Sequence, residues 1–557
     1  MVDISHLINL KATDPIDCSL QEDDQFDGRS DRGPIGGASP TLPTITANDP
    51  DLLRLQDNAW SALETKQPRT VFRRAAELVR VVVSTLGAII QRLTWTRLSY
   101  ELNRAAHWEK VTKGNRVPDR APKHLVEDML AHPEPPLPEL TRVVHMPVFV
   151  ASGDLLATPG YHRESGIFFA APADLCHDLQ VYRRIERPSS MDVLVAVEAL
   201  KDLLHDFPFV SDADWAHTIA LILLPFVREL IGGPTPLHLI YKPTPGTGGT
   251  LLAEVVNLLA TGLPLNTMTW GEWEPECQRT LSAALFAGRT YQVLDNVHRL
   301  DSAVLASAIT CDYWSDRKMG SSDAPSIPVR CGWIATGNNP ELSHEITRRT
   351  VPIHLDARME HPEDRQNFRH PDIRQFVKEH RSQLVKAAIT IVRAWQAAGQ
   401  PRGTTTLGMF ESWAQVMGGI LDVAAVPRFL GNLNDIRSHL DVYAANWIEF
   451  IGRWAAQFGT RPVGVNDLWA LIDTPRPLSL GLDRAKDVIS QKTSFGQQLV
   501  NHRDHVIGAY RLVSAGERQR AKQWQLKLVG EEPSERSEPT GEPPRDTFTG
   551  TKTTVIN

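Results

Sequence analysis

A glycine-rich run with the spacing of a phosphate-binding loop lies near the middle of the chain, Pro243-Thr-Pro-Gly-Thr-Gly-Gly-Thr250. It follows the apolar residues 237–241 and precedes the helix-like residues 251–260, the strand–loop–helix setting that such a loop needs. Backbone N–H groups of the loop and the N-terminus of the following helix wrap phosphate oxygens. The predicted nucleotide-binding residues are Gly246, Thr247, Gly248, Gly249, Thr250 and Leu251.

The loop departs from the usual pattern at one position. Such loops end Gly-Lys-Thr, with the lysine reaching the β- and γ-phosphates, whereas here Gly249 precedes Thr250. Losing that charge-assisted contact costs about 1.5–3 kcal/mol of binding, and more in the transition state. Lys242 is one candidate replacement; a solvent-facing lysine at a strand end is the alternative. The pattern predicts binding of ATP with Mg²⁺, which Thr250 would hold, and leaves hydrolysis open.

Two later segments place polar side chains after apolar strands. Asp295 follows the apolar residues 291–294, which is typical of the Walker B aspartate that holds Mg²⁺; a strand ending in an Asx turn is the alternative. Asn296 stands where many such ATPases carry a catalytic glutamate, so the general base stays open. Asn338 follows the buried residues 332–336, where a γ-phosphate sensor would sit; capping of the next helix is the alternative.

Arg348 and Arg349 lie between a short helix, residues 341–347, and a strand, residues 351–355. An arginine there can act on the nucleotide of a neighbouring subunit as an arginine finger. A surface ion pair is the alternative for each of them. We therefore expect Asp295, Asn338 and one of the two arginines to act together in catalysis.

The order of these segments resembles an AAA+ ATPase. The sequences of these segments are similar to those of the helicase/primase-like replication ATPases of phages, plasmids and integrative elements. Such proteins resemble superfamily-three helicases. The resemblance covers about residues 52–529 and is carried by residues 206–209, 243–252, 294–297, 333–340, 348–356 and 408–419. It implies a ring oligomer, with a hexamer as one option, that binds ATP and DNA as a helicase-like protein in replication of a mobile genetic element. The alternative is a hydrolysis-deficient scaffold, loader or regulator that binds DNA.

Two regions are candidates for DNA contact. Residues 313–322 predict a β-hairpin, which in the related helicases points basic residues into the ring's pore; Arg317 and Lys318 are the candidates, and a solvated turn is the alternative. Residues 484–529 hold nine Lys/Arg and three Asp/Glu, a net charge of +6 in a chain of −7. A Ser494–Gln497 capping box, a helix over residues 495–503 and strands over 509–513 and 523–529 predict a winged helix. Protein docking is its alternative role. The DNA-binding candidates are Lys492, Gln498, Arg503, Arg518, Arg520 and Lys522.

The elements that must position these residues predict an α/β P-loop AAA+ core with a parallel sheet, preceded by a mixed α/β region. Within the first region, residues 71–93 are predicted to be its clearest helix. The expected parts are a disordered segment 1–50, a helical and β region 51–205, the ATPase core 206–365, a helical lid-like domain 366–458, a winged helix 459–530 and a disordered tail 531–557.

Composition bounds the remaining possibilities. The 557 residues are 42% hydrophobic and 22% charged, which is typical of globular domains. The five cysteines form no C-x-x-C pair, so reduced thiols in a cytoplasmic protein are expected. The N-terminal sequence lacks the features of a secretory signal, and no apolar stretch reaches the roughly 20 residues of a membrane span. No primase or polymerase constellation precedes the loop, so such an activity would come from a separate partner.

Overall fold

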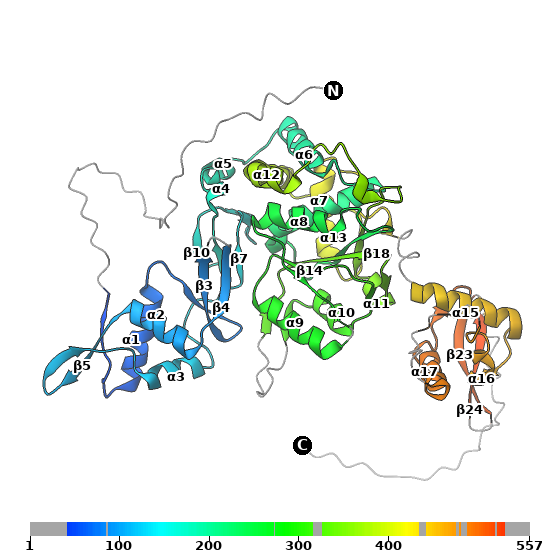
Figure 1. The fold of residues 1–557 in the computed structure, drawn as a ribbon, viewed down its shortest axis with the longest axis horizontal. Helices are drawn as coiled ribbons and strands as arrows, with labels where there is room; N and C mark the ends of the chain where they lie inside the picture. The colour runs from blue at the N-terminus through cyan, green and yellow to red at the C-terminus, as the bar shows by residue number, and fades with distance from the viewer. Residues whose placement is uncertain are drawn as a thin grey trace, which may run out of the picture. The chain divides into compact units, whose positions relative to one another are not determined.

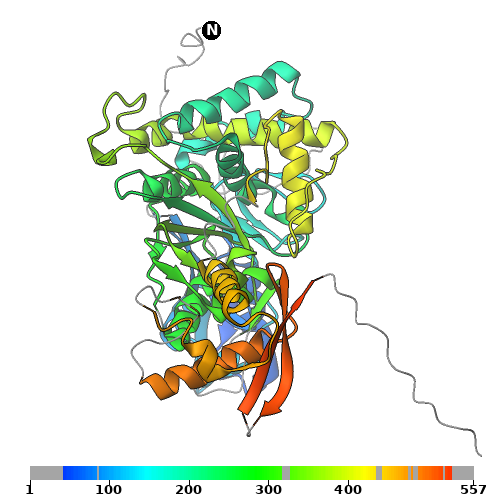
Figure 2. The same ribbon diagram turned by 90° about the vertical axis from the view of Figure 1, so that its right-hand side faces the viewer.

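A computed structural model describes residues 42–84, 87–271, 273–315, 326–433, 442–474, 478, 480, 487–518 and 521–529. The chain divides after Val442 into two compact units, which we describe separately (Figures 1 and 2). No helix among these residues has both the length and the apolar character needed to cross a bilayer.

The first part of the larger unit mixes short helices with antiparallel strands. Its helices are α1 (Leu52–Thr65), α2 (Trp95–Ala105) and α3 (Lys123–Ala131), and its strands are β1 (Thr44–Thr46), β2 (Val71–Arg74), β3 (Glu77–Ser84), β4 (Gly87–Arg92), β5 (His107–Thr112) and β6 (Asn115–Pro118). Strand β1 pairs with β5, so the predicted disorder of residues 1–50 is wrong for this stretch, while residues 1–41 lie outside the described residues.

The helix predicted over residues 71–93 is wrong. This segment is the antiparallel sheet β2-β3-β4. Burial alternates in the middle of β3, where Val79 and Val81 are buried and Arg80 and Val82 are only partly buried, which is the two-residue period of a strand. The β-branched valines that dominate the segment also favour a pleated strand over a helix.

A second group of strands leads to two long helices. The strands are β7 (Arg142–Val144), β8 (Val148–Phe149), β9 (Leu155–Leu156), β10 (Gly160–His162) and β11 (Ile167–Phe169), followed by α4 (Ala173–Cys176), α5 (Leu179–Arg183), α6 (Ser190–Leu204) and α7 (Asp212–Val227). Ser189 and Ser211 begin α6 and α7 with complete capping boxes, which fixes where both helices start.

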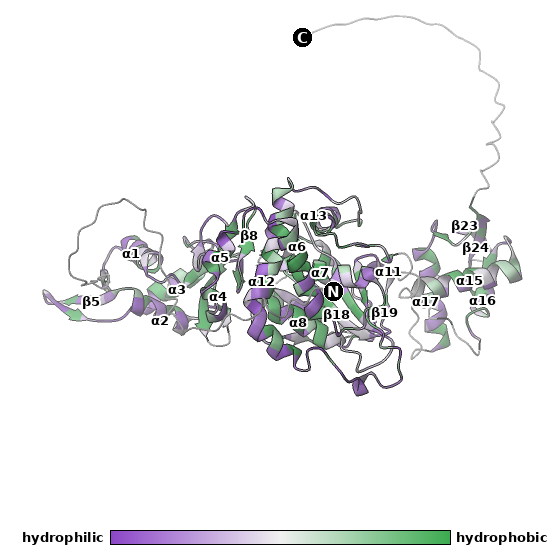
Figure 3. Cartoon of the chain, turned by 90° about the horizontal axis from the view of Figure 1, so that it is seen from above, coloured by the Kyte–Doolittle hydropathy of each residue, from purple (hydrophilic) through white to green (hydrophobic). Residues whose placement is uncertain are grey.

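The core is a five-stranded parallel sheet in the order β13-β14-β18-β12-β20. Its strands are β12 (Leu237–Lys242), β13 (Thr267–Met268), β14 (Tyr291–Leu294), β18 (Gly332–Asn338) and β20 (Thr350–His354). The helices around it are α8 (Gly249–Thr261), α9 (Glu274–Phe286), α10 (Ala303–Thr310), α11 (His344–Thr347), α12 (Ile373–Ala397) and α13 (Glu411–Val423). In Figure 1, α7, α8 and α12 gather on one side of the sheet and α9 and α10 on the other. Helix α7 and strand β18 are largely hydrophobic in Figure 3, as expected for elements that are buried almost throughout.

The smaller unit packs three helices against an antiparallel sheet in the order β21-β24-β23-β22. Its elements are α15 (Val442–Phe458), β21 (Val463–Gly464), α16 (Val465–Trp469), α17 (Val488–Asn501), β22 (Val506–Ile507), β23 (Tyr510–Arg518) and β24 (Ala521–Leu528). Trp454 of α15, Phe495 of α17 and Trp524 of β24 belong to its core. Helix α15, at the end of the expected lid-like region, therefore packs with the C-terminal unit.

Two boundaries predicted in the C-terminal unit are wrong. Helix α17 begins at Val488, because the Asp487 side chain accepts hydrogen bonds from the N–H groups of Ile489 and Ser490; Ser494 lies inside the helix. The strands predicted over residues 509–513 and 523–529 are too short at the hairpin end, because β23 continues to Arg518 and β24 begins at Ala521, with these two residues paired.

Arg381 of α12 ties three parts of the larger unit together. It is only 2% exposed, and it donates to the carbonyl oxygens of His145, Leu259 and Ala260 at 2.9–3.1 Å. Its Nη1 also pairs with Asp174 at 2.8 Å. One guanidinium thus satisfies buried acceptors from the strand region, the end of α8 and the start of α4.

We predict that Arg381→Met lowers the free energy of unfolding of this unit by about 3–5 kcal/mol, because it leaves buried acceptors and Asp174 without their donor. Arg374 lies on the same helix as Arg381 and makes an exposed ion pair with Glu254 of α8. Arg374→Met removes this pair and should cost at most about 1 kcal/mol. Denaturant unfolding followed by tryptophan fluorescence measures both, and equal losses would contradict the role given to Arg381.

Candidate nucleotide-binding site

The phosphate-binding loop lies between β12 and α8, as predicted. Gly248 caps α8 with φ of +100°, and Gly246 has φ of +82°. Both are left-handed values that favour glycine, so the loop can curl tightly ahead of the helix. The first N–H groups of α8 have no partner within the helix and carry its positive dipole end. This is the backbone cradle that an anionic phosphate chain requires.

One carboxylate oxygen of Asp295 accepts hydrogen bonds from two threonine hydroxyls. The hydroxyl of Thr250 donates to Asp295 Oδ1 at 2.8 Å, and the hydroxyl of Thr336 donates to the same oxygen at 2.5 Å. The backbone N–H of Asn296 in turn donates to Thr336 Oγ1 at 3.0 Å. The sequence predicted Thr250 and Asp295 as a pair, and the structure brings them together. Thr336 was not singled out as a site residue, although it lies two residues before Asn338.

The strand order explains why these residues meet. Strand β18 lies between β12 and β14, and all three are parallel. Their carboxyl ends therefore share one edge of the sheet, the edge at which ligands of such sheets bind. Thr250 just after β12, Asp295 just after β14 and Asn338 at the end of β18 consequently surround one point.

Lys242 is not a solvent-facing lysine. It ends β12, is 7% exposed, and its Nζ lies only 2.9 Å from the point where a Cβ on Gly249 would be. Burial lowers the pKa of Lys242, and the charge of Asp295 acts in the opposite direction. The ammonium group of Lys242 therefore occupies the space beside Gly249, at the first residue of α8, where the lysine of the usual motif would be attached.

Asn338 contributes an acceptor that no described residue of the chain uses. Its Oδ1 is buried and has no hydrogen-bond partner among the described residues. Asn338 pairs in register with Lys242, so its side chain belongs to the same edge of the sheet. A buried polar atom without a partner is uncommon, and a bound water or ligand would satisfy it. Asn296, in contrast, is exposed and has φ of +53°.

Two other segments cover the loop. Glu363 lies over Gly246, with its Oε2 2.7 Å from the position of a Cβ there. Phe207 lies against Gly248, with ring carbons 3.7–3.8 Å from the position of a Cβ. Neither was predicted as a site residue, because only the fold brings these distant segments to the loop. A Cβ at Gly246 would require Glu363 to move, whereas one at Gly248 would make ordinary contact with Phe207, so at Gly248 it is the positive φ that favours glycine.

The two arginines differ sharply. Arg349 is 8% exposed, and its Nη1 donates to the carbonyl of Glu345 at 2.6 Å, while the side chain of Arg348 is 47% exposed. The carbonyl of Arg349 accepts from Leu237 N at 2.9 Å, which places both arginines at the beginning of β12. Five steps along that strand, about 17 Å at 3.3–3.4 Å per residue, separate this edge from the nucleotide loop.

The predicted DNA-binding residues are only partly described. Strands β16 (Tyr313–Ser315) and β17 (Ser326–Pro328) pair antiparallel, as a hairpin stem requires, but Arg317 and Lys318 lie outside the described residues. Arg520 also lies outside them. Arg503 after α17, Arg518 on β23 and Lys522 on β24 are exposed, whereas Lys492 and Gln498 on α17 are partly exposed.

The described residues fit a magnesium–nucleotide complex. The cradle is free of Cβ atoms at Gly246, Gly248 and Gly249, and a hydroxyl and a carboxylate lie together beside it. Lys242 supplies the cation and Asn338 an unused polar atom. The described part of the chain has no group of three or more His, Cys, Asp or Glu side chains able to hold a metal by themselves, as expected where Mg²⁺ is held partly by phosphates and water.

No protein-family model matches the chain. No curated protein matches it. Among solved structures, it is similar to the C-terminal region of NrS-1 (11% identity, 81% of this chain and 96% of that one, TM-score 0.31). It is also similar to Cch of SCCmec type IV, described as an active helicase (11% identity, 84% and 98%, TM-score 0.34), and to JCV helicase (12% identity, 47% and 75%, TM-score 0.19). All three TM-scores lie below 0.5, so the site is assigned from its own geometry.

We predict that Thr336→Val raises the Kd for Mg-ATP about tenfold. Valine keeps the shape of this fully buried side chain, but it removes a donor to Asp295 and the acceptor for Asn296 N–H. Thr336→Ser keeps the hydroxyl and should change the Kd little. Calorimetric titration with and without Mg²⁺ measures the effect, and an equal loss for the two variants would show that the hydroxyl is not what matters.

Proposed function

We propose that the chain is an ATP-binding, DNA-binding protein of the AAA+ helicase-like class, and that Lys242 takes the place of the missing P-loop lysine. The observation that carries this proposal is the position of the Lys242 ammonium, 2.9 Å from where a Cβ of Gly249 would lie, beside the Thr250–Asp295 pair. A cation, a hydroxyl and a carboxylate around a glycine cradle are the groups that a magnesium–nucleotide site uses.

Each residue of the candidate site has a distinct role in this proposal. Bound Mg-ATP supplies the phosphoryl bond whose cleavage would drive movement on DNA. Lys242 neutralises phosphate charge, Thr250 and Asp295 hold the metal, and Asn338 orients a water or a phosphate oxygen. Thr336 keeps Asp295 in place through its hydroxyl. A preorganised lysine on a buried strand costs little to position, because its backbone is already fixed by two neighbouring strands.

The position of Arg348 supports assembly into a ring. It lies at the edge of the sheet opposite its own nucleotide loop, about 17 Å away along β12, so it could serve only the site of another subunit. Its exposed side chain suits that role, whereas buried Arg349 suits a structural one. The sequence resemblance supports a homo-oligomeric ring, for which a hexamer is one option, acting on DNA in replication of a mobile genetic element. A separate primase or polymerase would complete that task in the cytoplasm.

A second candidate function is a hydrolysis-poor scaffold, loader or regulator that binds nucleotide and DNA. The exposed Asn296 favours it, because this position lacks the carboxylate that would activate water. The two candidates share every binding residue and differ only in turnover.

Moving the lysine tests the assignment. We predict that Lys242→Ala raises the Kd for Mg-ATP about 10- to 150-fold, the equivalent of a lost charge-assisted hydrogen bond of about 1.5–3 kcal/mol. The double variant Lys242→Ala/Gly249→Lys, which restores the usual motif, should recover most of the affinity. Gly249→Lys alone should bind more weakly than the double variant, because its Cβ collides with Lys242 Nζ and two ammonium groups share one space.

Steady-state ATP turnover with and without single-stranded DNA completes this test. Turnover that is lost in both Lys242→Ala and Asp295→Ala supports the motor, and tight binding without turnover supports the scaffold. Lys378→Ala, an exposed lysine of α12, is the matched control. Unchanged binding in Lys242→Ala would refute the replacement of the P-loop lysine.

For the C-terminal unit we propose a winged helix that contacts DNA through α17 and the β23–β24 hairpin. Arg503→Ala/Arg518→Ala should weaken binding of duplex DNA and make the slope of log K against log[salt] shallower by about 1.8, or about 0.9 per lost phosphate contact. Arg461→Ala, an exposed arginine of the same unit outside these two elements, should leave the slope unchanged. Anisotropy titrations between 50 and 200 mM salt, roughly the range in which such binding falls steeply, measure it. An unaltered slope in the double variant would favour protein docking instead.

A further inference from the structure

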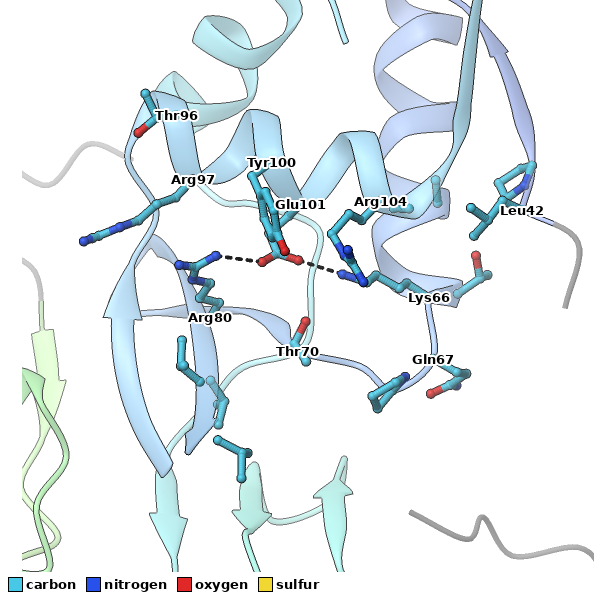
Figure 4. Close-up of a pocket in the computed structure, with 18 residues that line it drawn as sticks. Leu42, Lys66, Gln67, Thr70, Arg80, Thr96, Arg97, Tyr100, Glu101 and Arg104 are labelled. Atoms are coloured by element: carbon cyan, nitrogen blue, oxygen red, sulfur yellow. Dashed lines mark hydrogen bonds and ion pairs between the residues drawn. The ribbon is translucent and has the colours of Figure 1, made fainter. Parts of the chain in front are cut away.

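A cavity of about 820 Å³ opens in the N-terminal part of the larger unit, far along the chain from the nucleotide loop. It lies between the end of α1, strand β3 and helix α2 (Figure 4). Its lining includes four cationic side chains, one carboxylate and one aromatic ring: Lys66, Arg80, Arg97, Arg104, Glu101 and Tyr100. Four positive charges and one negative charge leave a net charge of +3 on the lining.

The aromatic ring of this cavity is open to solvent. Tyr100 is 53% exposed, although its neighbours on α2, Leu98 and Leu102, are completely buried. The guanidinium carbons of Arg80 and Arg104 lie 5.9 and 5.6 Å from the centroid of the Tyr100 ring. The structure therefore holds a large ring among cations without burying it in the core.

The cations divide into two groups. Lys66 and Arg80 pair with the two oxygens of the buried Glu101 at 2.7 and 3.0 Å, so this carboxylate neutralises part of the charge and fixes both side chains. Arg97 and Arg104 make no ion pair within the described part of the chain. Arg97 donates one hydrogen bond to the carbonyl of Arg92, and in Figure 4 it extends away from the Glu101 pairs. These two guanidiniums remain available to an anion.

We infer that this cavity binds a segment of single-stranded DNA. Exposed guanidiniums bind backbone phosphates, and an exposed tyrosine stacks on an unpaired base, which is the combination used by proteins that bind single strands. An acidic peptide would use the arginines but would give the ring no partner. A base inside a duplex is already stacked on its neighbours and has no free face for the Tyr100 ring. Thr70, Thr96 and Gln67 add polar groups to the lining of the cavity (Figure 4).

This site is independent of the nucleotide-binding function. It lies beside a separate hydrophobic cluster that contains Leu63, Leu98 and Ala105, and it shares no residue with the loop after β12. A single strand held here would give the chain a DNA contact that is present whether or not ATP is bound. Failure of the Lys242 experiment would therefore leave this inference standing, and the reverse also holds.

The test uses the full chain carrying Arg503→Ala/Arg518→Ala, which weakens the proposed duplex site, and a fluorescein-labelled oligothymidylate of about ten nucleotides. Adding Arg97→Ala/Arg104→Ala should make the slope of log K against log[salt] shallower by about 1.4, or about 0.7 per phosphate contact on a single strand. Tyr100→Ala should weaken binding about tenfold, and Tyr100→Phe, which keeps the ring, should not. Photocrosslinking of an oligonucleotide that carries 5-iododeoxyuridine should label the peptide that contains Tyr100.

The matched control is Arg120→Ala/Lys123→Ala, which removes two exposed cations of the same region that do not line the cavity. We expect it to leave the affinity and the salt slope unchanged. An equal effect of the control and the cavity variant would overturn the inference, as would a crosslink that omits this peptide. Competition by thymidine monophosphate or a polyglutamate peptide as effective as competition by the oligonucleotide would also overturn it, because a free nucleotide or an acidic peptide would then be the occupant.

Discussion

The space beside Gly249 is occupied by the ammonium group of Lys242, and a side chain on residue 249 would have to displace it. A Cβ at position 249 would lie 2.9 Å from Lys242 Nζ and 3.4 Å from its Cδ, closer than such atoms pack without movement. Gly249, which has no side chain, therefore leaves the space at the start of α8 that the buried side chain of Lys242 occupies. In the proposed site, the absence of a side chain on Gly249 lets the ammonium group of Lys242 approach the loop from β12 instead of from the helix.

Placing the cation on β12 changes its electrostatic setting. A lysine on the first turn of α8 would move with the helix, whereas Lys242 is the last residue of a strand that is hydrogen-bonded on both sides. Partial burial disfavours its charged form, and the nearby Asp295 favours it. Bound phosphates would favour the charged form further. The charge of Lys242 therefore depends on Asp295, the same carboxylate that accepts hydrogen bonds from Thr250 and Thr336. The proposed metal-binding and phosphate-binding groups are thus electrostatically coupled.

The sequence was informative where chemistry is local and poor where burial decides. Glycine spacing and the apolar run before Asp295 predicted the loop and the Thr250–Asp295 pair. The valine-rich residues 71–93 misled, because an apolar run of that length suits a helix as well as a sheet and only cross-strand pairing distinguishes them. The burial of Lys242 and the bond from Thr336 could not be predicted, since both depend on strands that lie far apart in the chain becoming neighbours in the sheet.

The same sheet that assembles the nucleotide site also separates it from the arginines. Parallel strands bring Thr250, Asp295 and Asn338 to their carboxyl ends, and this necessarily sends residues that precede β20 to the other end. Arg349 is held there by Glu345 and by the start of β12, which leaves Arg348 as the exposed member of the pair. In the proposed ring, Arg348 at this end of the sheet would act on the nucleotide bound by a second copy of the chain. The direction of the strands therefore places Arg348 away from the nucleotide loop of its own chain.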